Sequence, residues 1–104
     1  MSQQRIAQAR ERLAQFPQND LPRFSLAQAL YDAGEYREAA DHLRELAARK
    51  PDWMVVHILL GKCQWALHDS IAARHTLTHA LALAVAQHHD GPRAELTELL
   101  RTLD

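Results

Sequence analysis

Paired histidines are the residues of this sequence whose types and spacing could support metal chemistry. His75 and His79 are four positions apart, so on a helix they would share one face, as two ligands of a metal site do. Two ligands do not complete a site, and among seven histidines one such pair can arise by chance. We therefore interpret the pair as surface residues and expect no bound metal. His88 and His89 fit a helix C-terminus, where the helix dipole favours a cationic imidazole.

Cys63 is the single cysteine and the one candidate thiol nucleophile. It cannot form an intramolecular disulfide, which suits a reducing compartment. Its position is typical of a small buried residue, so we interpret it as part of the core. The sequence contains no Gly-rich phosphate loop, no Gly-x-Ser-x-Gly turn and no His-Glu-x-x-His motif. We expect neither enzymatic activity nor a bound cofactor.

Composition and charge favour an all-α protein of the cytoplasm. Hydrophobic residues make up 47% of the 104 positions, and many of them are alanine or leucine, which are strong helix formers. The formal net charge of −1 disfavours nucleic-acid binding through a broadly basic surface. The N-terminus lacks the apolar core of a secretory signal, and the apolar stretches at 54–60 and 80–86 are too short to span a bilayer. We expect a soluble cytoplasmic protein that binds neither nucleic acid nor membrane.

An internal repeat organises the helices that carry these residues. When the sequence is shifted by 34 positions it overlays on itself, which is the signature of a repeat architecture. The matching positions hold large apolar or small residues, as a shared packing scheme requires. They include the pairs Leu26 and Leu60, Ala27 and Gly61, Tyr31 and Trp65, Ala39 and Ala73, and Leu43 and Leu77.

The pattern predicts six helices in one domain spanning residues 1–104. Within it we distinguish a half unit, two helical hairpins and a terminal helix with a stripe of leucines. Asp20, Asp52 and Asp69 are the expected N-caps, Gly34 is the expected left-handed stop, and Pro92 suits a first helical turn. The expected bounds are about 2–16 for the half unit, 20–53 for repeat 1 (helices 21–33 and 35–49), 54–87 for repeat 2 (helices near 53–67 and 70–88), and 92–103 for the terminal helix.

These residues resemble the tetratricopeptide repeat family over positions 20 to 85. The first unit shows Leu26-Ala27, then Gly34-Glu35-Tyr36-Arg37-Glu38-Ala39, and ends at Pro51. The second shows Leu60-Gly61 and Ala73, but its turn reads Leu67-His68-Asp69-Ser70 where the family has Gly-x-Tyr. The resemblance implies a right-handed superhelical stack of antiparallel helix pairs.

The resemblance also implies that the first helix of each pair lines a concave groove that binds a peptide or helix. Several members hold a C-terminal carboxylate with Lys and Asn, but the equivalent positions here, Phe24, Gln28 and Leu59, offer no such donors. An apolar helix stripe is usually core, and this alternative stays open for Ile58 and Leu59. Carried over by position, the groove residues are Leu21, Phe24, Ser25, Gln28 and Tyr31, followed by Val55, Ile58, Leu59, Lys62 and Trp65.

The leading functional hypothesis is therefore an adaptor or chaperone-like module that binds a segment of another protein. Aromatic residues such as Tyr31 and Trp65 are typical anchors of binding energy. The alternative is a self-associating scaffold subunit, a homo-oligomer assembled through the helices at 5–16 and 92–103, because a short repeat array leaves two exposed ends.

Overall fold

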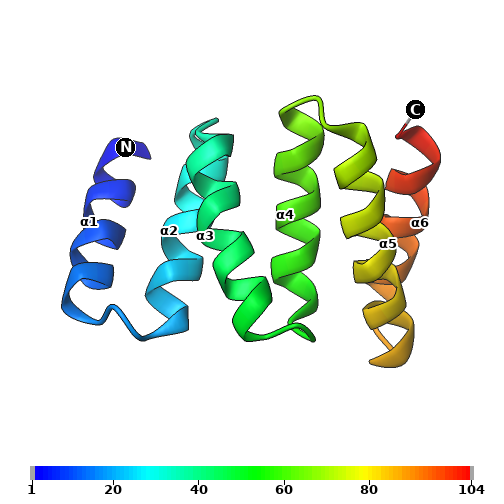
Figure 1. Ribbon diagram of the computed structural model, residues 1–104, viewed down its shortest axis with the longest axis horizontal. Coiled ribbons are helices and arrows are strands. Elements are labelled where there is room, and N and C mark those ends of the chain that lie inside the picture. Colours follow the sequence, from blue (N-terminus) through cyan, green and yellow to red (C-terminus); the bar gives the residue numbers. More distant parts are fainter. Residues whose placement is uncertain (1, 104) are drawn as a thin grey trace.

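The computed structural model describes residues 2–103 and contains, within them, six α-helices and no strand. Successive helices run in opposite directions and each packs on the next, so that the two ends of the chain lie at opposite ends of one row (Figure 1). This confirms the all-α stack of helical hairpins predicted from the sequence. The helices are α1 (Ser2–Gln15), α2 (Asp20–Asp32), α3 (Tyr36–Arg49), α4 (Met54–Ala66), α5 (Ser70–Ala86) and α6 (Asp90–Thr102).

Equivalent positions in the two hairpins have the same burial. Ala39 and Ala73 are both fully buried, as are Leu43 and Leu77. Gly61 is buried against Leu77, and a Cβ atom at this glycine would lie 2.5 Å from Leu77 Cγ. Small residues therefore stand where α4 and α5 approach most closely, as the repeat pattern predicts.

Two clusters of buried residues form the core. The first is centred on α2, α3 and α4, and Ile6 and Leu13 of α1 pack against it. The second joins α4, α5 and α6. Leu96 of α6 and Leu103, which directly follows this helix, are fully buried, and Leu99 and Leu100 are partly buried, which confirms the predicted leucine stripe. Neither hairpin could bury these faces alone, so stacking stabilises both.

The turns after α2, α4 and α5 have one geometry. Gly34, His68 and His88 adopt left-handed backbone conformations with φ of 81°, 65° and 60°. After α2, the Glu35 amide donates to the Leu30 carbonyl at 2.8 Å, which closes the helix in a Schellman motif. The Asp69 amide makes the same bond to the Gln64 carbonyl at 2.9 Å after α4. The second turn is therefore as tight as the first, although it lacks glycine.

Asn19, and not Asp20, caps the N-terminus of α2. The Asn19 Oδ1 accepts a hydrogen bond from the Leu21 amide at 3.2 Å. Asp20 is the first residue of the helix, and its carboxylate pairs with Arg49 of α3 at 3.1 Å. The prediction of Asp20 as the cap was wrong. Two adjacent residues could both cap this helix, and Asp20 instead forms the ion pair with Arg49.

The other predicted helix starts had mixed outcomes. Asp69 caps α5 as expected, with its Oδ1 accepting a backbone amide at 3.2 Å. Asp52 does not cap α4, because Trp53 takes that position and makes no side-chain cap bond. α6 begins at Asp90, before the expected start, so that Pro92 lies within its first turn.

Within residues 2–103, no helix combines the length and the apolar character needed to cross a bilayer.

Candidate functional site

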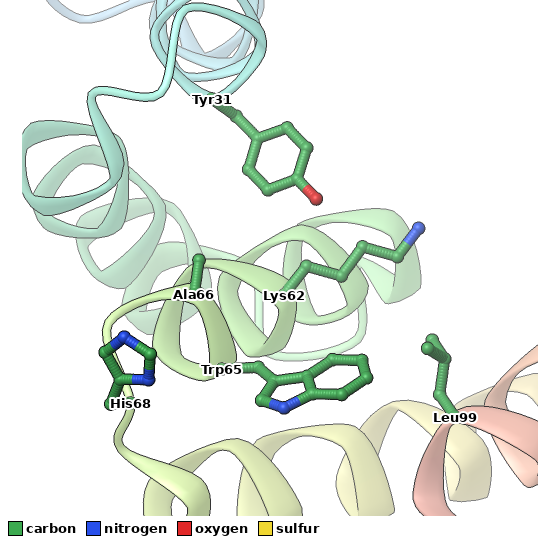
Figure 2. Close-up of a pocket in the computed structure, with 6 residues that line it drawn as sticks. All are labelled: Tyr31, Lys62, Trp65, Ala66, His68 and Leu99. Carbon is green, nitrogen blue, oxygen red and sulfur yellow. The ribbon is translucent and has the colours of Figure 1, made fainter. Parts of the chain in front are cut away.

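An open pocket with a volume of about 350 Å³ is lined by side chains of α2, α4, the turn after α4, and α6. Its aromatic walls come from Tyr31 on α2 and Trp65 on α4, which are equivalent positions of the 34-residue repeat. Figure 2 shows both rings directed toward the space between the helices, with Leu99 of α6 closing the far side. We call this site the aromatic pocket; its six lining residues are Tyr31, Lys62, Trp65, Ala66, His68 and Leu99.

Tyr31 is held in place by its neighbour on the next helix. Its ring meets the edge of the Tyr36 ring at a centroid distance of 5.4 Å and an interplanar angle of 64°. This edge-to-face contact is a favoured aromatic geometry. Burial is the main cause that raises the pKa of Tyr31, so its hydroxyl stays protonated and can donate a hydrogen bond into the pocket.

Polar groups stand at the rim of the pocket. Lys62 is half-buried, and its Nζ lies 3.8 Å from the Glu95 carboxylate of α6. Trp65 is 36% exposed, which leaves part of its ring open to a ligand. An aromatic wall with a few donors at its edge is suited to an apolar side chain that carries a polar group or a backbone nearby.

The residues predicted to line one groove lie in separate places in the structure. Tyr31, Lys62 and Trp65 meet in the aromatic pocket. Leu21 and Ser25 instead border a separate hollow with Phe16 at the turn between α1 and α2. The predicted set is therefore not one continuous pocket.

Four other predicted residues line neither of these two hollows. Phe24 packs on Trp53, with ring centroids 5.2 Å apart. Gln28 donates to Asp32 at 3.0 Å. Val55 is exposed, whereas Ile58 is half-buried against the second core cluster.

Leu59 does not line the groove, so this part of the prediction was wrong. It is only 6% exposed and belongs to the core cluster formed with α2 and α3. Ser25, the equivalent residue 34 positions earlier, is exposed beside α1. The difference arises because α4 is covered by a preceding hairpin, whereas α2 is preceded by a single helix.

Sequence reasoning missed three residues of the pocket, Ala66, His68 and Leu99. His68 was expected in the turn of the second unit, where it occupies the position of Gly34, but it was not among the predicted groove residues. Leu99 was predicted only as a member of the leucine stripe of the terminal helix. It is only partly buried, because α6 ends the row and no further hairpin covers it.

The cysteine and the histidine pair that could have supported chemistry lie in surroundings that do not suit catalysis. Cys63 is fully buried, and burial raises the pKa of its thiol to about 11, which confirms its assignment to the core. His79 contacts His57 at a ring-centroid distance of 4.5 Å, whereas His75 is exposed. Within residues 2–103, no group of three or more His, Cys, Asp and Glu residues is arranged to hold a metal ion.

The fold and its repeat define an all-α protein built from stacked helical hairpins. A family model described as tetratricopeptide repeat matches residues 1–63. The TPR repeat-containing protein PA0015 of Pseudomonas aeruginosa is 35% identical over 92 residues, which is 88% of this chain and 88% of that protein. The chain belongs to the tetratricopeptide repeat family.

Solved structures have the same arrangement of helices. The solution structure of protein BPP2914 from Bordetella parapertussis has a TM-score of 0.82 at 28% identity, over 94% of this chain and 85% of that one. The crystal structure of PcrH from Pseudomonas aeruginosa has a TM-score of 0.76 at 21% identity, over 82% of this chain and 65% of that one. Repeats of this family generally serve as non-enzymatic modules for protein–protein interaction.

Proposed function

We propose that this protein is an adaptor or chaperone-like module that binds a peptide or helix of another protein across α2, α4 and α6. The observation that supports this proposal most is the convergence of Tyr31 and Trp65 on one open pocket. These rings repeat at equivalent positions, so a bound segment would meet one after the other. We further propose that the chain acts as one stack in the cytoplasm.

The aromatic pocket would act as the anchor point of the interface. Tyrosine and tryptophan contribute large contact areas at a low cost in side-chain entropy, and they are enriched among the residues that dominate binding energy. Leu99 adds an apolar wall, while Lys62 and His68 offer polar contacts at the rim. We expect the partner to insert one large apolar or aromatic side chain here.

Self-association through the terminal helices has less support. Among the residues whose burial is described, Phe16 is the one exposed large hydrophobic residue within the segments 5–16 and 92–103, and the others lie elsewhere. The outer faces of a repeat array are typically polar, because they remain in water. Sedimentation over a range of concentrations tests this alternative, and a reversible dimer that is lost on substitution in α1 or α6 would favour it. The exposed residues are Phe16, Leu21, Val55, Trp65, Ile71 and Val85.

Partner capture by a pocket variant tests the proposal. A Tyr31→Ala, Trp65→Ala double variant removes both rings, and loss of about 2 kcal/mol for each should lower affinity by at least about 100-fold. The matched control is Ile71→Ala, Val85→Ala, which removes two exposed apolar side chains of α5 from outside the pocket. If the folded pocket variant captured as much partner as the wild type, the proposal that the aromatic pocket binds the partner would be contradicted.

A further inference from the structure

Two histidines from different helices converge on one backbone oxygen. The Nε2 of His57 on α4 lies 2.8 Å from the Pro51 carbonyl oxygen, and the Nε2 of His79 on α5 lies 3.2 Å from the same atom. The two rings are nearly perpendicular, with an interplanar angle of 71° and centroids 4.5 Å apart. Three potential ligand atoms are therefore gathered from α4, α5 and the turn between α3 and α4.

The two imidazoles can either donate hydrogen bonds to this oxygen or bind a metal ion together with it. In the hydrogen-bonded form each Nε2–H donates to the Pro51 carbonyl. If the ring proton moves to Nδ1 through solvent, each imidazole stays neutral and both Nε2 lone pairs become available on the side of the carbonyl oxygen. A metal ion could then join two nitrogens and one oxygen without a change in backbone position.

The distances fit two ligands of one metal ion. Metal bonds of about 2.1 Å that meet at a right angle separate two ligand atoms by about 3.0 Å, whereas a tetrahedral angle separates them by about 3.4 Å. The separation of 2.8 Å from the Pro51 oxygen to His57 Nε2 is near the right-angled value, and the separation of 3.2 Å to His79 Nε2 lies midway between the two values. The distances therefore do not select between the tetragonal sites typical of Cu²⁺ and Ni²⁺ and the tetrahedral sites that Zn²⁺ prefers.

The surroundings suit a preorganised site that is open on one side. His57 is nearly buried, and burial is the main cause that lowers its pKa, so its imidazole is neutral and able to bind a metal at pH 7. His79 is exposed, which leaves room for water ligands. Gln87 fixes the same turn by donating from Nε2 to the Asp52 carbonyl at 2.9 Å.

We propose that the Nε2 atoms of His57 and His79, with the Pro51 carbonyl oxygen, form a binding site for one divalent transition-metal ion. This differs from the expectation of no metal, which considered the pair His75 and His79. A bound ion would tie the α3–α4 turn to α5 and raise the thermal stability of the second hairpin.

Calorimetric titration of the untagged protein with Cu²⁺, Ni²⁺ and Zn²⁺ salts tests the site. We expect one ion per chain and at least tenfold weaker binding in His79→Gln and in His57→Gln. Both glutamines keep a donor for the Pro51 carbonyl, and His79 is exposed, so the folded state should persist. The matched control His75→Gln, one turn away on the same helix, should bind as tightly as the wild type.

Spectroscopy of the Cu²⁺ complex supplies a second readout. Pulsed electron paramagnetic resonance should detect two coupled imidazoles in the wild type and one in His79→Gln. Equal loss of affinity in His75→Gln and His79→Gln, or loss only on substitution of His88 and His89, would overturn the proposal. Absence of binding to the folded wild type would overturn it as well.

Discussion

His68 occupies in the second hairpin the position that Gly34 occupies in the first, and both residues hold a left-handed backbone. Their φ angles are 65° and 81°. A residue with a Cβ atom pays about 1–2 kcal/mol for this conformation, whereas glycine adopts it freely. The hydrogen bonds of the turn are nevertheless complete, so the second hairpin carries a local conformational cost that the first does not.

His68→Gly should therefore stabilise the protein. We expect an increase of about 1 kcal/mol in the free energy of unfolding, since relief of the left-handed conformation exceeds the added entropy of the unfolded chain. Urea denaturation measures this change. His75→Gly is the control, because it places glycine within α5 and should lower stability by about 1 kcal/mol. A His68→Gly variant no more stable than the wild type would contradict the prediction.

Gly61→Ala should destabilise the protein even though alanine is the better helix former. The added Cβ would collide with Leu77, and such overpacking costs about 1–3 kcal/mol against a gain of about 1 kcal/mol in helix propensity. Chemical denaturation should show a net loss of about 1 kcal/mol. At Gly91 of α6 a Cβ would meet no atom within 4 Å, so Gly91→Ala should cause no loss. Equal stability of the two variants would show that Leu77 shifts without cost.

Acid should weaken the fold through His57. Burial first, and then repulsion from His79, lower the pKa of His57 in the folded state, although the hydrogen bond to Pro51 opposes them. As the pH falls below about 6.5, the unfolded chain binds a proton at this residue more readily than the folded chain does, so stability decreases. The free energy of unfolding should fall more steeply between about pH 7 and pH 5 in the wild type than in His57→Gln. Parallel curves would contradict this assignment.

Cys63 should resist thiol reagents while the protein is folded. Its side chain is fully buried and its pKa of about 11 leaves almost no thiolate at neutral pH. We expect labelling by an aromatic disulfide at about pH 8 to be limited by opening of the fold and to become rapid in concentrated guanidinium chloride. Fast labelling of the folded protein would show that the first core cluster is open near α4.

The repeat predicted the architecture because its signal lies in side-chain size. Ala39 and Ala73 are small where helices cross, and the 34-residue spacing predicts that they have like surroundings. Tyr31 and Trp65 were placed on the same face by the same spacing. Helix starts were harder to predict, because adjacent residues such as Asn19 and Asp20 can both cap and the choice depends on a partner elsewhere.

Sequence periodicity does not predict which side chains of different helices contact each other. Spacing within one helix suggested His75 and His79 as a pair, but the partner of His79 is His57 of the preceding helix. Leu99 reaches the aromatic pocket because α6 lies beside α4 and ends the row, a relationship that depends on three-dimensional stacking. Sequence alone also left open whether Leu59 lines the groove or belongs to the core, and the structure places it in the core.

Site-specific photo-crosslinking in cells tests the central claim most directly. A photoreactive phenylalanine analogue replaces Tyr31, Trp65 or Leu99, one on each of the three helices of the pocket, or the 87% exposed Ile71 on α5 as the control. The account predicts that one and the same protein is crosslinked from all three pocket positions and not from Ile71. Crosslinks to a partner from Ile71, with none from the pocket positions, would contradict it.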